Sequence, residues 1–366
     1  MKSVDLVLRK VLLGLARSSR FKALAVRLPM TAAVVARFVP GETVFHCVTA
    51  VRTLAADNLL SSIDYLGEDT TTPEQAAAIS DGYLNLISEL AAVGLTGYAE
   101  VSVKLTALGL GLPGGRDLAF GHAREICAAA AAVGTTVTVD AEDHTTTDTT
   151  LGILADLRKE FPATGGVLQA YLHRTLEDCA VLAGPGSRIR LCKGAYAEPV
   201  DVALQGREEV SVAYVACARS LLAGEGYPML ATHDPEMIAA VAELARQLGR
   251  EPGSFEYQML YGIRSDEQRR LGPAARRCGC TCRSAPTGGA TSSAASPSAR
   301  RTSSSLRAPC SVAEERCGSA HLGGRRELRG DRAGGEGCPV VGELVQRAGD
   351  VGAGRLRRPA VEVAAT

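Results

Sequence analysis

Charged and amide side chains recur inside, or at the ends of, apolar stretches along the middle of the chain. They are Lys104, Asp140 with Glu142, Gln169, Arg190 with Lys193, Thr232 with His233, and Gln258. A charge buried in a strand is costly unless it is paired or used. Together these side chains offer cations for a carboxylate or an anionic cofactor, carboxylates for an amine, and amides for hydrogen bonds. Their repetition indicates one active site assembled from several segments.

Strand and helix patterns alternate from about residue 60 onward. Runs rich in β-branched residues predict strands at 98–108, 135–142, 166–172, 188–196, 229–233 and 255–261, with an earlier one near 61–66. Between them, 3.6-residue periodicity predicts helices at 73–93, 117–133, 149–161, 175–182, 208–223 and 235–248. The helix at 73–93 has the clearest start, with Thr72 as N-cap, Pro73 next and Gln75 completing a capping box. Single strands alternating with single helices predict a parallel sheet of the α/β class.

Two closures of such a sheet are possible, a doubly wound open sheet or a (βα) barrel. An open sheet gathers its ligands at one switch point. A barrel brings all its strand ends to one face, so a polar group near the end of nearly every strand favours the barrel. Gly109, Gly111 and Gly114 match a dinucleotide fingerprint, but Pro113 removes a backbone donor that the motif needs. We therefore interpret this segment as a loop between strand and helix.

Charge divides the 366 residues into three parts, although the net charge is zero. Residues 1–40 carry eight basic side chains and one acid. Their pattern predicts a basic amphipathic helix. That helix either packs on the domain in solvent or lies on an anionic membrane surface. Residues 41–271 form the predicted acidic barrel. Residues 272–366 hold 15 Arg, 8 acids and no aromatic side chain, so we expect this Arg/Gly/Ser-rich tail to be disordered.

Neither a membrane span nor a metal site is predicted. No stretch has 18 uninterrupted apolar residues, so we expect a cytoplasmic protein with at most peripheral contact to the inner face of the membrane. Cys278, Cys280 and Cys282 lack the two-residue ligand gap and a second cluster. Nucleic-acid binding by the arginine-rich tail is not expected, because the tail has no aromatic residue or recognisable motif.

Six segments, taken in order, carry more specific information than the strand and helix pattern. They are Val101–Leu108, Val139–Glu142, Gln169–Leu172, Arg188–Tyr196, Ala231–His233 and Phe255–Gly262. In this order and spacing the chain resembles the proline dehydrogenases, the flavin-dependent proline oxidases, in their single-function bacterial form. The resemblance runs from about Asp64 to Leu271. It implies a distorted (βα)8 TIM barrel, an FAD oxidoreductase of proline catabolism, L-proline as substrate, oxidation to pyrroline-5-carboxylate and a quinone as electron acceptor.

The resemblance also implies residue roles. Lys104 is expected to bind the substrate carboxylate and to pair with Asp140, the carboxylate beside the substrate. Arg190 is expected to act in catalysis with Asp140 and to contact the flavin, and Tyr196 to pack on the substrate. The other expected flavin contacts are Ala141, Gln169, Lys193, Gly194, Ala195, Thr232 and His233. Without the resemblance, Lys104 and Asp140 could also form a structural ion pair, and Gln169 and Gln258 could satisfy buried backbone groups.

The family pattern stops at about Leu271. The family continues with an eighth strand and a final helix bearing an Arg-Arg pair that binds the substrate carboxylate. One permitted set of codons for Cys278–Cys282, shifted by one base that Arg277 supplies, can encode Val-Arg-Val-Tyr-Val. The same shift continued through Arg301 can encode an Arg-Arg-Leu-Ala-Glu-Arg-Pro run. We therefore hypothesise a single-base frameshift near 271–277. The chain as given is then expected to lack the eighth strand and final helix, and to have weak or no turnover.

Two other functions stay open on the sequence alone. A Schiff-base aldolase on the same barrel would use Lys104 or Lys193 as its amine nucleophile. A catalytically dead barrel remnant would bind flavin without turnover, as the missing arginine pair suggests.

Overall fold

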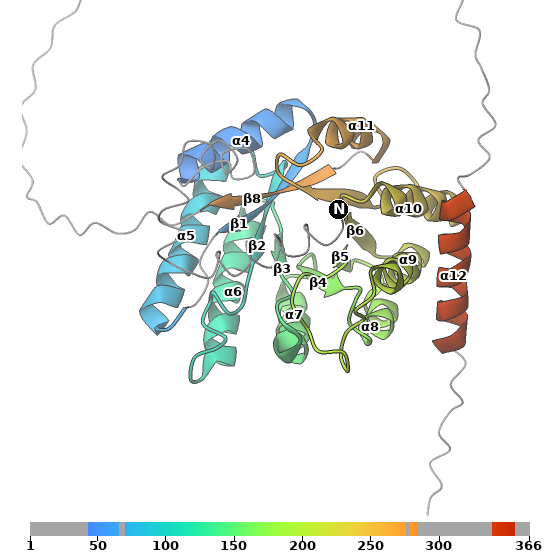
Figure 1. Ribbon diagram of the computed structural model, residues 1–366. Helices are drawn as coiled ribbons and strands as arrows, with labels where there is room; N and C mark the ends of the chain where they lie inside the picture. Colours follow the sequence, from blue (N-terminus) through green and yellow to red (C-terminus); the bar gives the residue numbers. More distant parts are fainter. Residues whose placement is uncertain (1–42, 66–69, 276–277, 285–338, 356–366) are drawn as a thin grey trace, which may run out of the picture. The chain divides into compact units, whose positions relative to one another are not determined.

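Eight parallel strands follow one another around a closed barrel in the computed structural model, which describes residues 43–65, 70–275, 278–284 and 339–355 (Figure 1). The strands are β1 (Leu60–Tyr65), β2 (Ala99–Val103), β3 (Val137–Val139), β4 (Gly165–Gln169), β5 (Arg188–Cys192), β6 (Tyr227–Ala231), β7 (Glu256–Leu260) and β8 (Cys278–Ser284). The predicted barrel is confirmed, and the open sheet is excluded.

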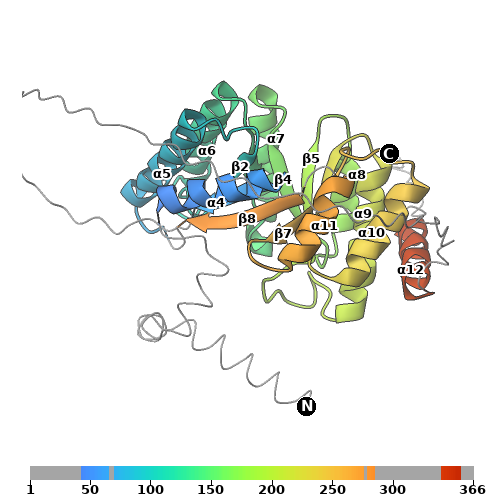
Figure 2. The ribbon, with the colours of Figure 1, turned by 90° about the horizontal axis from the view of Figure 1, so that it is seen from above.

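Helices lie between and around these strands (Figures 1 and 2). They are α4 (Val44–Ala56), α5 (Pro73–Ala92), α6 (Gly115–Ala132), α7 (Thr147–Glu160), α8 (Thr175–Leu182), α9 (Arg207–Ala223), α10 (Pro235–Gln247), α11 (Ser265–Ala275) and α12 (Pro339–Arg355), with a short 3-10 turn η1 (His144–Thr146). Helix α5 begins as the sequence predicts: the Thr72 hydroxyl accepts a hydrogen bond from the Gln75 backbone N–H at 3.3 Å. Helices α4 and α11 lay outside the sequence prediction.

The buried apolar side chains of strands and helices form two large clusters. In the first, Ile63 of β1, Val101 of β2 and Val139 of β3 pack with the inner faces of α4 to α7, and all three are fully buried. The second joins β5 to β7 with α8 to α10 and α12. Such outward-facing branched residues are what a parallel barrel covered by helices requires. The polar residues that interrupt these runs therefore point to the other side, into the barrel.

The strands are shorter than predicted at their carboxyl ends, and this difference positions the polar residues. Strand β2 ends at Val103 because the chain turns at once, with the Leu108 N–H donating to the Lys104 carbonyl at 3.2 Å. The glycines of the neighbouring segment serve the turn into α6. Gly114 has φ +69°, and a Cβ on Gly115 would lie 2.2 Å from the Leu110 carbonyl oxygen. The loop interpretation of this segment agrees with that geometry.

The expected loss of the eighth strand is wrong. Strand β8 pairs with β7, where Gln258 is opposite Gly279, and with β1, where Ser62 is opposite Thr281. The two neighbouring strands each offer a row of unpaired backbone groups, and the hydrogen bonds that they make compensate for the weak strand propensity of a Cys- and Gly-rich segment. The barrel thus extends past residue 271, the boundary that the sequence predicted.

The expectation of a disordered tail is also corrected at its far end, where α12 forms. Val341, Leu344, Val345 and Ala348 are buried in the second core cluster. Arg219 of α9 also donates to the Val345 carbonyl at 3.1 Å. Helix α12 carries no Arg-Arg pair, so it is not the final helix that the family resemblance implies. Arg300 and Arg301, and the predicted amphipathic segment 1–40, lie outside the described residues.

Within the described ranges, no helix combines the length and the apolar character that crossing a bilayer requires.

Candidate active site

The polar residues singled out in the sequence converge at the carboxyl ends of the barrel strands. Lys104 follows β2, Asp140 and Ala141 follow β3, Gln169 ends β4, Lys193 to Tyr196 follow β5, and Thr232 and His233 follow β6. Parallel strands in a barrel bring these ends to one face, where barrel enzymes carry their active sites. The structure therefore places these predicted residues on one face. Arg190 differs, because it lies in the middle of β5 and inside the barrel.

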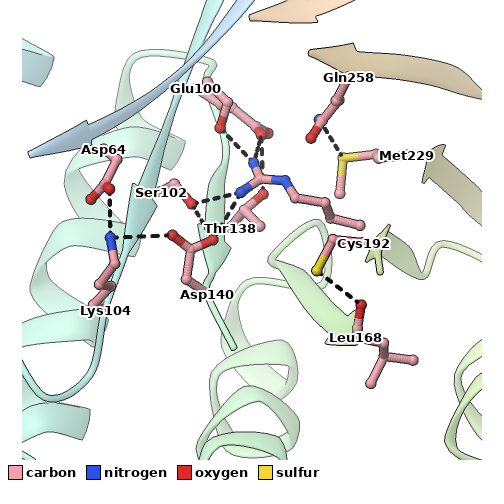
Figure 3. A network of polar contacts seen from close by, with 12 residues as sticks. Asp64, Glu100, Ser102, Lys104, Thr138, Asp140, Leu168, Cys192, Met229 and Gln258 are labelled. Carbon is pink, nitrogen blue, oxygen red and sulfur yellow. Dashed lines mark hydrogen bonds and ion pairs between the residues drawn. The ribbon is translucent and has the colours of Figure 1, made fainter. Parts of the chain in front are cut away.

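Lys104 links two carboxylates at this face (Figure 3). Its ammonium lies 2.5 Å from Asp64 Oδ2 and 3.8 Å from Asp140 Oδ2. The predicted pair with Asp140 is present but is the longer contact. Asp64 was missed as a site residue, although it is a carboxylate inside an apolar run, the same signal that identified the others. Strand pairing explains the contact, because Asp64 on β1 is opposite Ser102 on β2, two residues before Lys104.

Arg190 is the centre of a buried polar network. Its guanidinium donates to Asp140 Oδ1 at 2.8 Å and to the Ser102 hydroxyl at 3.0 Å. It also donates to the Ser62 hydroxyl at 2.6 Å and to Glu100 Oε1 at 3.2 Å, and the residue is 7% exposed. Ser102 in turn donates to Asp140 at 2.8 Å. The Asp140 carboxylate is thus fixed on one oxygen by Arg190 and Ser102, with its other oxygen directed toward Lys104.

Glu142 and Gln169 form a second buried group beside this network. Glu142 accepts hydrogen bonds from the backbone N–H (3.0 Å) and the hydroxyl of Thr106. Burial raises the pKa of Glu142 above its usual value, and these hydrogen bonds oppose the shift. The Gln169 amide donates to the Glu142 carbonyl at 2.7 Å. Gln169 therefore satisfies a buried backbone group, as the structural interpretation predicted, and this fixes its side chain at the mouth of the barrel.

The segment after β5 combines an accessible cation with a close backbone approach. The Lys193 ammonium lies 2.9 Å from both the Ser211 hydroxyl and Asp234 Oδ2, and its side chain is 30% exposed. Gly194 has φ +109°, and a Cβ there would lie 2.3 Å from the Tyr171 ring. Only glycine fits both conditions. Ala195 and Tyr196 follow on the surface, with Tyr196 43% exposed.

His233 connects β6 to β7 at the same face. Its Nε2 accepts a hydrogen bond from the Leu260 backbone N–H at 2.8 Å, so this nitrogen carries no proton. Burial, assisted by the Arg264 guanidinium, lowers the pKa of His233 below 6.5. Next to it, the Asp234 backbone N–H donates to Thr232 Oγ1 at 3.1 Å, and the Asp234 side chain caps α10. The hydrogen bond from the Leu260 N–H to Nε2 requires a neutral His233 imidazole.

A neutral His233 predicts a specific pH dependence of stability. Because its folded pKa lies below its unfolded value, the unfolded chain binds the proton first as pH falls. The stabilisation is therefore complete above about pH 6.5 and is lost as pH falls toward the folded pKa. His233→Gln keeps an acceptor but does not titrate, so its melting temperature should decline less between about pH 7 and about pH 5. An equal decline in both proteins would contradict this prediction.

Comparison with known proteins identifies the family of this chain. A family model described as proline dehydrogenase matches residues 47–291. The chain belongs to the proline dehydrogenase family. The match starts within α4 and runs through β8, so the closing strand lies inside the family domain and not beyond it.

Relatives of the same size are consistent with the assignment. A proline dehydrogenase of Deinococcus radiodurans is 36% identical over 271 residues, which is 73% of this chain and 86% of the relative. Proline dehydrogenase 1 of Bacillus subtilis is 34% identical over 235 residues, 64% of this chain and 76% of the relative. The protein is an oxidoreductase that oxidises proline in proline catabolism. Nothing in this family assignment favours the aldolase alternative.

Solved structures support the fold. Proline utilization A from Bdellovibrio bacteriovorus, inactivated by N-propargylglycine, superposes with a TM-score of 0.64 at 22% identity over 70% of this chain. The equivalent protein from Corynebacterium freiburgense gives 0.61 at 19% identity. The chain spans about a third of the length of these larger proteins, 31% and 29% respectively. At these identities the likeness shows the fold alone: the described barrel has the same fold as these proteins.

Proposed function

We propose that the chain oxidises L-proline to pyrroline-5-carboxylate with FAD bound across the carboxyl ends of the strands, and that a quinone is the final electron acceptor. The observation that carries the proposal is the cluster of Lys104, Asp64 and Asp140 at the same end of the barrel as the Lys193–Tyr196 segment, in which Ala195 and Tyr196 are exposed. The first group offers fixed charges for an amino acid. The second offers an accessible cation, Lys193, and exposed residues beside it, Ala195 and Tyr196, for a large cofactor.

The residues present fit a flavin in their chemistry. The Lys193 ammonium makes two hydrogen bonds and is 30% exposed, which leaves one N–H for a ligand. Gly194 has φ +109°, and the Tyr171 ring fills the space that a Cβ there would take, so the segment is fixed against Tyr171. Gln169 and Thr232, the further expected contacts, are each held by a hydrogen bond. We propose that these residues, with Ala141, Ala195 and His233, would hold FAD.

FAD, when bound, supplies the acceptor for the hydride that leaves the carbon beside the proline nitrogen. The chain's own residues would bind and orient the substrate. Lys104 would hold the proline carboxylate, Asp140 would lie beside its nitrogen, and Tyr196 would pack on the ring. Arg190 fixes the Asp140 carboxylate through a 2.8 Å contact, so we assign it to positioning Asp140 as well as to the flavin contact expected from the family. Side chains held in place in this way lower the activation barrier, because they do not have to reorganise during the reaction.

A visible spectrum tests the cofactor and the substrate together. The purified chain, incubated with FAD and desalted, should retain a flavin absorption band that proline bleaches under anaerobic conditions. D-proline serves as the matched control. A chain that retains no flavin would refute the cofactor proposal. Retained flavin that proline leaves unbleached would instead favour the dead-barrel alternative. Borohydride trapping of a carbonyl substrate on Lys104 or Lys193 would be the signature of an aldolase.

The electron acceptor and the membrane contact need a separate test. Vesicles of anionic lipid containing a quinone should increase turnover and retain the protein on flotation if segment 1–40 lies on the membrane. A chain without residues 1–40 is the control, since it should keep dye-coupled activity and lose flotation. Equal flotation of both chains would overturn the membrane proposal.

A further inference from the structure

The loop between β5 and α9 carries a buried carboxylate that the proposed function does not use. Glu198 is 9% exposed and lies two residues after Tyr196. Its Oε1 accepts a hydrogen bond from the His144 backbone N–H at 3.0 Å, and its Oε2 contacts His144 Nδ1. A carboxylate taken out of water is costly unless it is paired and hydrogen-bonded. The two contacts with His144 meet this requirement.

The same contacts join two loops of the candidate active site. His144 begins η1, four residues after Asp140 in the loop that follows β3. Glu198 belongs to the loop that follows β5 and starts with Lys193. Hydrogen bonds to a carboxylate are stronger than those between neutral groups. Glu198 therefore attaches the loop of the expected flavin contacts to the loop of the expected substrate carboxylate.

Tyr171 extends this attachment to the backbone beside the expected contacts. Its hydroxyl donates to Glu198 Oε1 at 3.4 Å, and the residue is 7% exposed. Burial, and then the Glu198 carboxylate, raise the pKa of Tyr171, while a hydrogen bond from the Tyr196 backbone opposes the rise. The Tyr171 hydroxyl thus lies between Glu198 and the Tyr196 backbone. Its ring also lies against Gly194, where a Cβ would be 2.3 Å from it.

Backbone hydrogen bonds hold the two ends of the same loop. The Tyr171 N–H donates to the Lys193 carbonyl at 3.0 Å, and the Leu204 N–H donates to the Tyr171 carbonyl at 2.8 Å. Between these ends, the side chains of Glu198 and Tyr171 make the contacts described above. The position of residues 194–198 therefore depends on these two side chains.

We propose that Glu198 is a positioning residue, which holds segment 193–196 in place through His144 and Tyr171. This segment contains residues assigned to flavin contact and to substrate packing, so its position should determine how tightly flavin binds. The effect on flavin binding rests on the proposed function. The hold of Glu198 on the loop needs no ligand and can be measured without one.

Hydrogen exchange of the full chain, followed by mass spectrometry, measures this hold. In Glu198→Ala, the backbone amides of residues 194–204 should exchange about tenfold faster than in the unchanged chain, while those of β6 keep their rate. Glu198→Gln should exchange at an intermediate rate, because its amide oxygen can still accept from the His144 N–H. This partial rescue would identify the carboxylate contacts as the cause.

Two further variants complete the exchange experiment. Tyr171→Phe keeps the ring against Gly194 but loses the hydroxyl, so it should also exchange faster in residues 194–204. Glu177→Ala is the matched control, because it removes an exposed glutamate from α8, the helix that follows Tyr171. It should exchange as the unchanged chain does. Glu198→Gln and Tyr171→Phe nearly keep the size of the side chain, so the comparison stands even if Glu198→Ala fails to fold.

Flavin affinity separates positioning from a purely structural role. The dissociation constant of FAD, measured by quenching of its fluorescence, should rise about tenfold in Glu198→Ala, the loss expected from one charge-assisted hydrogen bond. Glu198→Gln should recover most of the affinity, and Glu177→Ala should keep all of it.

Each outcome decides the proposal. Unchanged exchange of residues 194–204 in the Glu198 and Tyr171 variants would overturn it. Faster exchange with unchanged FAD affinity would overturn it too, because Glu198 would then stabilise the loop without positioning the flavin contacts. An unchanged chain that binds no FAD would refute the cofactor proposal instead, and the exchange rates alone would then decide whether Glu198 holds the segment.

Discussion

Restoring the shifted reading frame from the 271–277 window should increase kcat/KM for proline at least about a hundredfold over the chain as given. The resemblance implies that an Arg-Arg pair binds the substrate carboxylate. The given sequence contains the doublet Arg300-Arg301, but this doublet is read in a different frame from the family's pair and does not take its role. Charge-assisted hydrogen bonds contribute about 1.5–3 kcal/mol each, so two arginines give about 3 kcal/mol or more. Each 1.36 kcal/mol is about tenfold in rate, which gives the hundredfold minimum.

Dye-coupled assays of the two chains measure this effect directly. A restored chain whose arginine doublet is replaced by two methionines is the matched control, because it keeps the restored strand and helix but loses the carboxylate contacts. It should turn over proline as poorly as the chain as given. Equal rates of the given and restored chains would contradict the prediction. Sequencing the coding DNA through the window tests the frameshift itself, and an intact frame with no shifted similarity would refute it.

Arg190→Met should lower the melting temperature by about 10 °C or more. Removing this guanidinium leaves Asp140 without its 2.8 Å partner and takes one of two arginines from Glu100. Breaking a buried ion pair by removing one partner costs about 3–5 kcal/mol. In a domain of this size each kcal/mol is about 2–4 °C. Activity should fall as well, because Asp140 loses the contact that orients it.

A surface arginine provides the control for this experiment. Arg174 contacts Asp148 at 2.5 Å and Asp178 at 2.8 Å, but its side chain is 40% exposed. Exposed pairs contribute about 0–1 kcal/mol, so Arg174→Met should melt within about 3 °C of the unchanged chain. Similar losses from both substitutions would show that Arg190 is not the structural centre proposed for it.

The barrel was predictable from sequence because its polar residues mark the strand ends. Lys104, Asp140, Gln169 and His233 interrupt apolar runs at comparable places, and only a closed ring brings such places to one face. The pairing among these residues was less predictable. Asp64 is the nearer partner of Lys104 because β1 and β2 are neighbours with Asp64 opposite Ser102. The shorter contact of Lys104 with Asp64 depends on the register between β1 and β2, which residue spacing in the sequence does not reveal.

The closing strand could not be predicted from composition. Residues 278–284 read as Cys-Gly-Cys-Thr-Cys-Arg-Ser, a poor strand by propensity. They nevertheless form β8, because β7 and β1 leave backbone hydrogen bonds unmade on both sides of one gap. The backbone hydrogen bonds to β7 and β1 therefore outweigh the low strand propensity of this segment. In the same way, the apolar residues of α12 are buried against α9 and α10 rather than left exposed.

The pairing of β1 with β8 has a consequence for how the protein is made. The first strand of the ring cannot be completed on one side until the last one has been synthesised. Contacts between such distant parts of a chain slow folding, because the loop between them must lose its freedom first. A nascent chain halted before residue 278 would expose two hydrogen-bonding edges, which invites association with other chains. Chaperone dependence during translation should therefore end only after β8 has emerged from the ribosome.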